Sequence, residues 1–297
     1  MAHHHHEINH KNLGVTVILN VLITLGELIG GLISGSMALI TDAAHNFSDV
    51  LALVISYLAN RLAKRQATTR HTYGFGRSEI IAAFANSVTL IVIALFIIYE
   101  ATERIISPVE INSDWVIYLA GGSILLNGLS VLLISQDAEK NMNMRSAYLH
   151  LFSDMMTSVG VLIGGLVMKF FHWYYVDALF SIAIALYLLY LSWAIFRDSL
   201  RILMQFAPKN IDVEDICQEI AALDGIVNIH HVHCWQLDDH KRLFDAHIDL
   251  ASDICLSEFE KKLATIKEIL AGHGITQVNI QPEFGVEDSK ELIHHHK

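Results

Sequence analysis

Two stretches, LITDAAHNFSDV (Leu39–Val50) and HLFSDMMTSVG (His150–Gly160), decide how this sequence is interpreted. Each carries a histidine followed four residues later by an aspartate, inside an otherwise apolar run. The i, i+4 spacing puts both members of a pair on one helix face. Two such helices packed face to face would present two imidazole nitrogens and two carboxylate oxygens, a set that suits tetrahedral Zn²⁺. The pairs are His45 with Asp49 and His150 with Asp154.

An ionisable side chain at the centre of a bilayer costs at least ~3 kcal/mol on insertion scales, so it is normally paired or metal-bound. One alternative is that each pair only joins helices by hydrogen bonds. Two copies in separate apolar segments favour a metal site over that alternative. Because metal ligands must be deprotonated, metal binding would release protons. Imidazole titrates near neutral pH, so His45 and His150 are better proton carriers than the aspartates.

The composition is that of a polytopic membrane protein. Of the 297 residues, 53% are hydrophobic and 17% are charged, with a mean hydropathy of +0.42. An average soluble domain has roughly a quarter charged residues. Six runs reach the length of about 20 residues that a transmembrane helix needs, which predicts a six-helix transmembrane domain over residues 13–206. The runs lie within Leu13–Thr41 and at about Met37–Asn60, Ile80–Tyr99, Trp115–Ser135, Ser146–Met168 and Ala178–Phe196.

Basic residues in the short loops predict the orientation of these spans. Five basic residues lie between the second and third spans, and further ones precede the first span and follow the fourth and sixth. The opposite side has only Arg104 and Lys169. Both termini are therefore expected in the cytoplasm. The compact loops and the lack of a targeting segment favour a bacterial inner membrane.

After Pro208 the pattern changes to that of a soluble domain. From Ala207 onward there are 17 acidic and 8 basic residues, which supply −9 of the net charge of −11 and argue against nucleic-acid binding. Periodicity predicts an α-β-β-α-β cytoplasmic domain over residues 207–286, a histidine-rich tail over 1–12 and a C-terminal tail over 287–297. The expected elements are Asp212–Leu223, Ile226–Leu237, Leu243–Leu250, Leu256–Leu270 and Ile275–Ile280.

Several other polar residues lie in or near the spans. Each is as consistent with a hydrogen bond between helices as with a step on an ion path. Asp177 is expected at the start of the sixth span, where it would interact with the dipole of its own helix. The remaining residues of this kind are Asn20, Glu27, Asp42, Asn127 and Ser158.

The two opening stretches, with YGFGRSEIIAAFAN (Tyr73–Asn86), VDALFSIAIAL (Val176–Leu186), HVHCWQL (His231–Leu237) and IQPE (Ile280–Glu283), resemble the cation diffusion facilitator family over nearly the whole chain. The resemblance implies a homodimer that exports a divalent metal from the cytoplasm, usually in exchange for protons, and a metallochaperone-like cytoplasmic domain. Histidine in both pairs is similar to the zinc-transporting members, whereas members with aspartate in the first pair are broader in metal choice. The transport site implied is His45, Asp49, His150 and Asp154.

Further metal ligands are expected in the cytoplasmic domain. Strand alternation places His231 and His233 on one face, and a hairpin could bring either beside His247, with Glu283 on the third strand. The resemblance implies metal binding by histidines of the first two strands and by a histidine plus an acidic residue at the third. This sequence keeps these four residues but lacks the histidine expected at the third strand. The alternative is a set of surface histidines.

The loop between the second and third spans carries a weaker signal. Some members of the family have a metal site there with an aspartate and two histidines, of which only His71 is matched. The arginine-rich run Arg61–Arg70 is explained more simply as an anchor at an anionic leaflet. The runs His3–His6 and His294–His296 are either native or remnants of a purification tag.

The sequence therefore favours a proton-coupled Zn²⁺ exporter and not an enzyme. An intramembrane metal hydrolase would need an open coordination position and a general base, whereas no HExxH motif occurs and all four ligands are committed. A membrane-anchored metal sensor would not need two charged pairs within the bilayer. Within the transporter class, Cd²⁺, Co²⁺, Ni²⁺, Fe²⁺ or Mn²⁺ is the alternative cargo, because the affinity order of metals alone does not select zinc.

Overall fold

The computed structural model describes residues 10–138, 142–238 and 241–293. The histidine runs at both ends of the chain lie outside these residues. Contacts divide the chain into two compact units, which are considered separately. One unit is Met1–Ile55 with Ala85–Ile195, and the other is Ser56–Phe84 with Phe196–Lys297.

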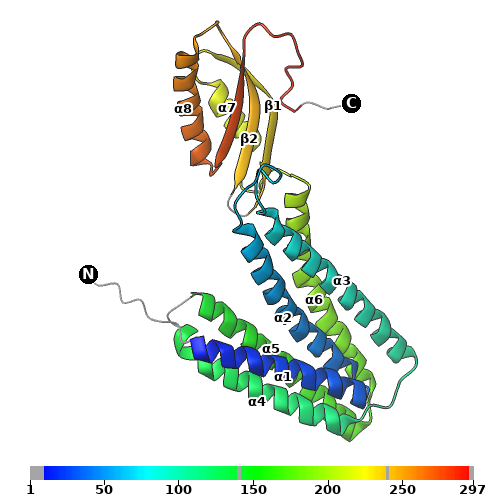
Figure 1. Ribbon diagram of the computed structural model, residues 1–297. Helices are drawn as coiled ribbons and strands as arrows, with labels where there is room; N and C mark the ends of the chain where they lie inside the picture. The colour runs from blue at the N-terminus through cyan, green and yellow to red at the C-terminus, as the bar shows by residue number, and fades with distance from the viewer. Residues whose placement is uncertain (1–9, 139–141, 239–240, 294–297) are drawn as a thin grey trace. The chain divides into compact units, whose positions relative to one another are not determined.

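Six helices form the first two thirds of the chain (Figure 1). Each of the six apolar runs found in the sequence falls in one of them. Helices α2 to α6 contain apolar segments long enough to cross a membrane, whereas the apolar part described for α1, Ile18–Ser34, is shorter. The count of six spans therefore stays a prediction. The helices are α1 (His10–Ser34), α2 (Met37–Ala63), α3 (Arg77–Ile106), α4 (Ser113–Ala138), α5 (Met142–Phe171) and α6 (Tyr175–Leu203).

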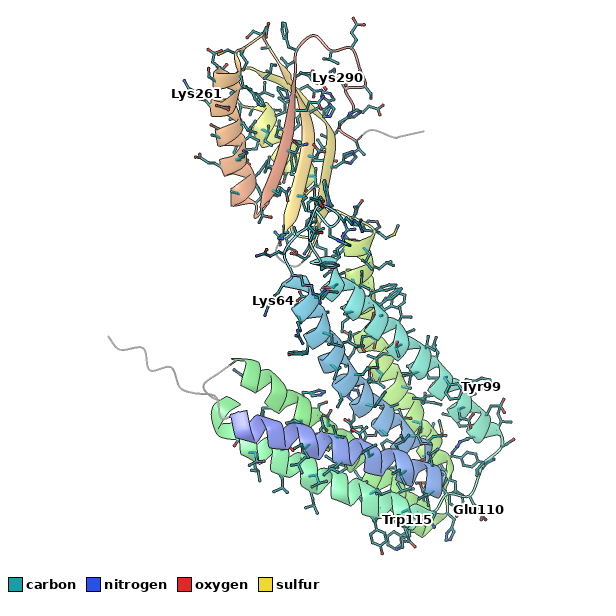
Figure 2. The ribbon with its side chains drawn as sticks, viewed as in Figure 1. Lys64, Tyr99, Glu110, Trp115, Lys261 and Lys290 are labelled. Atoms are coloured by element: carbon teal, nitrogen blue, oxygen red, sulfur yellow. The ribbon has the colours of Figure 1, made fainter. Side chains whose placement is uncertain are left out.

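The helices of the first unit bury polar side chains and expose apolar ones. Asn127 and Ser181 are fully buried, whereas Phe96 and Leu132 are 63% and 70% exposed. Tyr99 also lies on the outer surface, as Figure 2 shows. This distribution is the reverse of that in a soluble protein, and it matches a solvent of lipid chains around a hydrogen-bonded interior.

The start of α2 is fixed by a residue from α6. Gly35, with a φ of +75°, reverses the chain between α1 and α2, a conformation that glycine adopts without a steric penalty. Asp177 then accepts hydrogen bonds from Met37 N at 2.7 Å, from Ala38 N at 3.3 Å and from the Ser36 hydroxyl. Asp177 lies in the first turn of α6, as expected, but the hydrogen bonds of its carboxylate are made to a different helix. Its carboxylate satisfies free N–H groups at the N-terminus of α2, the helix that carries His45.

The C-terminal part of the chain has the order α7, β1, β2, α8, β3. The three strands form one sheet in the order β1-β2-β3, with β1 antiparallel and β3 parallel to β2. Asp212 caps α7 by accepting hydrogen bonds from the Glu214 and Asp215 N–H groups. Apolar residues of both helices and all three strands share one core. The bounds are α7 (Val213–Ala221), β1 (Ile226–Gln236), β2 (Arg242–Leu250), α8 (Leu256–Gly272) and β3 (Gln277–Glu283).

The segment after β3 does not form a separate tail over its described residues. It runs along the outer edge of β1, where His231 N donates to the Glu291 carbonyl at 3.3 Å and Val232 N donates to the Leu292 carbonyl at 2.8 Å. The Leu292 side chain packs against the core of the domain. This return of the chain places residues 288–292 beside strands that are distant in sequence.

Candidate metal centres

The two histidine–aspartate pairs of the opening stretches converge in the first unit. Within α2, His45 Nδ1 lies 3.5 Å from Asp49 Oδ2, and within α5, His150 Nε2 lies 3.6 Å from Asp154 Oδ2. Between the helices, His45 Nε2 lies 3.6 Å from Asp154 Oδ1, and His150 Nε2 lies 3.4 Å from Asp49 Oδ2. We call these four side chains the quartet. Each histidine is in contact with both carboxylates, so the quartet forms a closed ring.

These separations fit a shared ion. A tetrahedron with metal–ligand distances of about 2.1 Å has ligand–ligand edges of roughly 3.4 Å, close to the 3.4–3.6 Å observed. Both carboxylate oxygens of Asp154 are buried and accept no hydrogen bond from the described residues. His45 presents one ring nitrogen to each aspartate, and a metal ion would bind one of these two nitrogens. Two carboxylates would neutralise a dication there.

Access differs around the quartet. The side chains of Asp154 and His45 are 1% and 12% exposed, whereas those of Asp49 and His150 are 29% and 43% exposed. Two members of the ring are therefore largely buried and two are partly accessible.

A chain of buried polar groups extends from the quartet. Asn46 Nδ2 donates to Glu27 Oε2 at 3.0 Å, which joins α2 to α1. The Ser158 hydroxyl lies 3.3 Å from Asp42 Oδ2 and 2.9 Å from the Ser123 hydroxyl, which joins α5 to α2 and α4. Of the polar residues noted in the spans, Asp42 and Ser158 are thus in direct contact, and Glu27 contacts Asn46.

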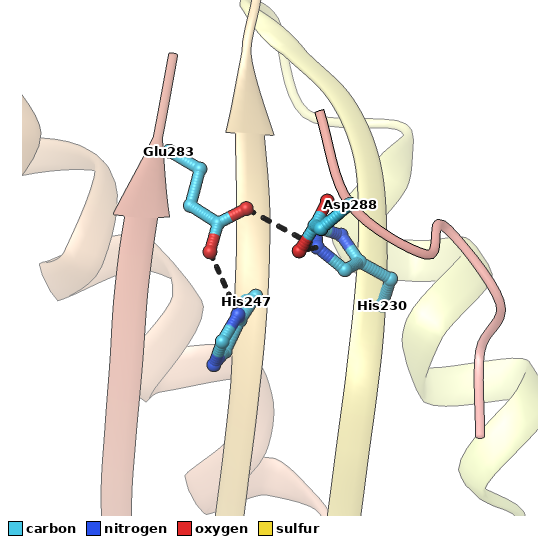
Figure 3. Close-up of side chains that lie close together, drawn as sticks. All are labelled: His230, His247, Glu283 and Asp288. Atoms are coloured by element: carbon cyan, nitrogen blue, oxygen red, sulfur yellow. Dashed lines mark ion pairs between the residues drawn. The ribbon is translucent and has the colours of Figure 1, made fainter. Parts of the chain in front are cut away.

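A second cluster lies on the sheet of the C-terminal domain. Four residues there offer ligand atoms that all lie within 4.8 Å of one another. Glu283 bridges the histidines, with Oε1 2.7 Å from His247 Nδ1 and Oε2 3.3 Å from His230 Nε2. Asp288 Oδ2 lies 3.4 Å from the same nitrogen of His230 (Figure 3). The cluster is His230, His247, Glu283 and Asp288.

This cluster differs from the predicted one because of an irregularity in β1. The pairing runs from His230 opposite His247 to His233 opposite Asp245, so two residues of β1 oppose one residue of β2. His231, with a φ of +52°, lies in this bulge. A bulge interrupts the alternation on which the prediction depended. Of the described residues, His230 enters the cluster, and neither His231 nor His233 belongs to it.

The two predicted histidines lie in different places. The His231 ring remains a neighbour, with its centroid 4.9 Å from that of His247. His233 is exposed and lines a separate cavity with Gln205 and Trp235. Of the ligands predicted for the domain of residues 207–286, the structure brings together His247 and Glu283. The other two members of the cluster, His230 and Asp288, were missed by the sequence analysis.

A lysine occupies the edge of this cluster. Lys290 Nζ lies 2.8 Å from Asp249 Oδ1 and 3.4 Å from Glu283 Oε2, and it also contacts Asp288. The hydrogen bond from the Lys290 ammonium lowers the pKa of Asp288. Asp249 Oδ2 in turn lies 3.6 Å from His230 Nδ1, where it orients the ring. The ammonium group thus stands among the carboxylates that a metal ion would use.

His71 lies on the loop between α2 and α3, and its ring stacks on Phe75 with centroids 4.7 Å apart. Its Nδ1 is 3.4 Å from the Thr68 hydroxyl. Among the described residues, His71 belongs to no group of metal-ligating side chains. Within the described part of the chain, the predicted loop ligand therefore has no further metal-ligating side chain beside it.

Apolar helices with two converging histidine–aspartate pairs, followed by a small α+β domain, are the arrangement expected of a transporter of metal cations. Residues 13–204 match the model of the cation efflux transmembrane domain. Residues 208–284 match the model of the cytoplasmic domain of cation efflux proteins. The chain belongs to the cation diffusion facilitator family, whose members are cation efflux transporters and not enzymes.

Curated relatives cover nearly the whole chain. The chain is 36% identical to the "Cadmium, cobalt and zinc/H(+)-K(+) antiporter" of Bacillus subtilis (strain 168), over 95% of this chain and 92% of that protein. It is 32% identical to the "Metal cation efflux system protein CzcD" of Cupriavidus metallidurans, over 99% and 93%. It is 33% identical to the "Zinc transporter ZitB" of Escherichia coli (strain K12), over 88% and 84%.

Proposed function

We propose that this protein exports Zn²⁺ from the cytoplasm in exchange for protons, with the quartet as the transport site. The observation that supports the proposal is the closed ring of contacts between two helices, in which each histidine lies within 3.6 Å of both carboxylates. Two imidazoles and two carboxylates suit tetrahedral Zn²⁺.

Proton exchange follows from the chemistry of these ligands. Each must be deprotonated to bind metal, so Zn²⁺ binding releases protons and protonation expels Zn²⁺. His45 and His150 have side chains that titrate near neutral pH in water. In the proposed cycle the inward-open site binds Zn²⁺, the helices rock, and protons from outside displace the ion. The empty protein then returns with protonated histidines.

Zinc flux into liposomes tests this function. Purified protein is reconstituted with a zinc dye and a pH dye in the lumen, and the lumen is made acidic. We expect zinc entry to be faster with the acidic lumen and to be accompanied by loss of luminal protons. A rate of zinc entry that does not depend on the pH gradient would contradict proton exchange. Entry of Cd²⁺ or Co²⁺ without Zn²⁺ would show that the transported metal is not zinc. If no divalent metal entered, the proposed transport activity would be refuted.

The first histidine is proposed to set metal choice. We expect His45→Asp to lower the preference for Zn²⁺ over Mn²⁺ by about tenfold, because a third carboxylate in place of an imidazole favours harder ions. Competitive uptake of the two metals into the liposomes measures the ratio. His172→Asp, which places the same change outside the quartet, is the matched control. If the ratio of Zn²⁺ to Mn²⁺ uptake is unchanged in His45→Asp, His45 does not determine metal selectivity.

The assembly and orientation are also proposals. We propose a homodimer of six-span subunits in a bacterial inner membrane, with both termini and the domain of residues 207–286 in the cytoplasm. The excess of basic residues in the loops on one side supports the orientation. Labelling of Cys255, which is exposed in the domain, by a membrane-impermeant thiol reagent tests it. Labelling in inverted vesicles but not in intact cells is expected.

We further propose that the cytoplasmic cluster binds a regulatory Zn²⁺. Two imidazoles and two carboxylates with ligand atoms within 4.8 Å of one another support this site. In this site Asp288 is supplied by the segment that runs along β1. Metal binding would therefore hold the end of the chain to the sheet.

Lys290 and a metal ion would compete for the same carboxylates. We expect Lys290→Gln to tighten zinc binding at the cytoplasmic cluster by roughly tenfold, because a nearby positive charge is removed. Isothermal titration of the full chain carrying Asp154→Ala, which silences the transport site, measures the affinity. Lys261→Gln, on the exposed face of α8 (Figure 2), is the matched control. Equal or weaker binding in Lys290→Gln would contradict competition.

A further inference from the structure

Two more carboxyl groups are buried beside the quartet. Glu27 on α1 and Asp42 on α2 are 2% and 1% exposed. One oxygen of each is held by a neutral group, Glu27 Oε2 by the Asn46 amide and Asp42 Oδ2 by the Ser158 hydroxyl. The other oxygens, Glu27 Oε1 and Asp42 Oδ1, are buried, and no amide or basic group of the described residues donates a hydrogen bond to them. The two carboxyl groups are neighbours, because Asp42 is joined through the Ser158 hydroxyl to Ser123, which lines the same cavity as Glu27, and they interact with each other.

The described lysines and arginines do not balance the charge of this pair. Among the described residues, no lysine or arginine forms an ion pair with Glu27 or Asp42. Arg104 is engaged elsewhere, with the Gly35 carbonyl and Glu100. Two ionised carboxylates side by side in this interior would be strongly unfavourable, and neighbouring carboxyls of this kind share one proton. The titratable groups that interact with the pair from the surrounding helices are Asp154 on α5, with both carboxyls, and His45 on α2, with Glu27. Tyr118 on α4 lines a cavity beside Glu27.

The pair is linked to the quartet but is not part of it. The Ser158 hydroxyl lies 3.3 Å from Asp42 Oδ2 and 3.1 Å from the backbone carbonyl of Asp154. Asn46, which holds Glu27, follows His45 directly in the chain. A dication in the quartet would therefore act on the pair across a short, water-poor distance, where charges interact strongly. Its positive charge favours the ionised form of both carboxyls.

A cavity adjoins Glu27. It has a volume of about 120 Å³ and is lined by Gly26 and Glu27 from α1 and by Tyr118 and Ser123 from α4, among other residues. A Cβ added at Gly26 would meet no atom within 4 Å. Its polar lining residues are Glu27, Tyr118 and Ser123, and the other six are leucine, isoleucine or glycine. None of the quartet residues lines this cavity.

We propose that the Glu27–Asp42 pair carries one of the protons exchanged for metal. The pair holds a shared proton when the quartet is empty and releases it to water when a dication binds. When the metal leaves, the pair takes up a proton again. The step breaks and forms one carboxyl O–H bond and involves no redox change. The inference rests on the proposed function, because it requires metal in the quartet.

Proton release during zinc binding tests the pair. The full chain, in detergent and carrying His247→Ala to disable the cytoplasmic cluster, is titrated with zinc in weak buffer near pH 7. Glu27→Gln and Asp42→Asn are each expected to release about one proton fewer per zinc than the parent, with zinc affinity within about tenfold. The double variant should release the same number as either single variant, because the residues share one proton. Glu103→Gln, an exposed residue of α3, is the matched control.

The outcomes separate this inference from the proposed function. Equal proton release in the parent and both single variants would overturn the role of the pair. Loss of zinc binding in both variants, with unchanged thermal unfolding, would also overturn it, because the residues would then be ligands or supports of the quartet. The variant Asp154→Ala is measured in the same zinc titration. If it binds zinc and releases protons as the parent does, the quartet itself is not the zinc site, and the proposed function fails.

Discussion

Asp154→Ala should reduce zinc transport at least about 100-fold, since loss of a ligand weakens a metal site more than the 10–100-fold caused by loss of a supporting contact. Asp154 is the most buried member of the quartet, with one oxygen 3.6 Å from each histidine. Its removal leaves two imidazoles and one carboxylate. A dication would then keep an uncompensated charge inside the protein, which is strongly unfavourable.

Zinc entry into liposomes at matched protein density measures this effect. Asp114→Ala is the matched control, because Asp114 is an exposed aspartate of α4 that pairs with Lys169. We expect its flux to stay close to that of the wild type. Asp154→Glu should recover part of the flux, because it restores a carboxylate at the wrong distance. Zinc flux that survives Asp154→Ala would refute the assignment of the quartet as the transport site.

Asp177→Ala should destabilise the membrane domain. It removes the acceptor of three buried hydrogen bonds at the start of α2, from Ser36, Met37 and Ala38. Buried donors left without an acceptor cost about 1–3 kcal/mol each, and neighbouring losses are not additive. We expect a fall of roughly 3 kcal/mol in the free energy of unfolding, which corresponds to about 6–12 °C in the thermal midpoint for a domain of this size.

Thermal unfolding in detergent, followed by tryptophan fluorescence, measures this loss. Asp198→Ala, on the same helix but 52% exposed, is the matched control and should change the midpoint little. Asp177→Asn should recover part of the stability, since an amide oxygen still accepts from the backbone of α2. A midpoint that is unchanged in Asp177→Ala would mean that α2 does not depend on this cap.

The helices and the quartet could be predicted from the sequence because both depend on local spacing. A run of about 20 apolar residues indicates a helix wherever its neighbours lie. The i, i+4 spacing of His45 with Asp49, and of His150 with Asp154, requires only that the segments be helical. Because an ionisable group in an apolar segment is normally paired or metal-bound, the two pairs are then expected to lie close together.

The cytoplasmic cluster could be predicted only in part because it depends on contacts between distant segments. Strand alternation was sound for His247, but no glycine or asparagine marks the bulge at His231 that brings His230 into the cluster. Asp288 reaches the cluster only because the chain returns along β1. The cap at Asp177 has the same origin, since 139 to 141 residues separate it from its donors.

The returning segment also has a consequence for how the protein is handled. Strand β1 is an outer strand of the sheet, and residues 291 and 292 pair with its His231 and Val232 N–H groups. A chain shortened after Phe284 would leave these donors open to the strands of other molecules, and exposed edges of this kind promote aggregation. For expression and purification, an affinity tag should therefore be added after the complete returning segment and should not replace it.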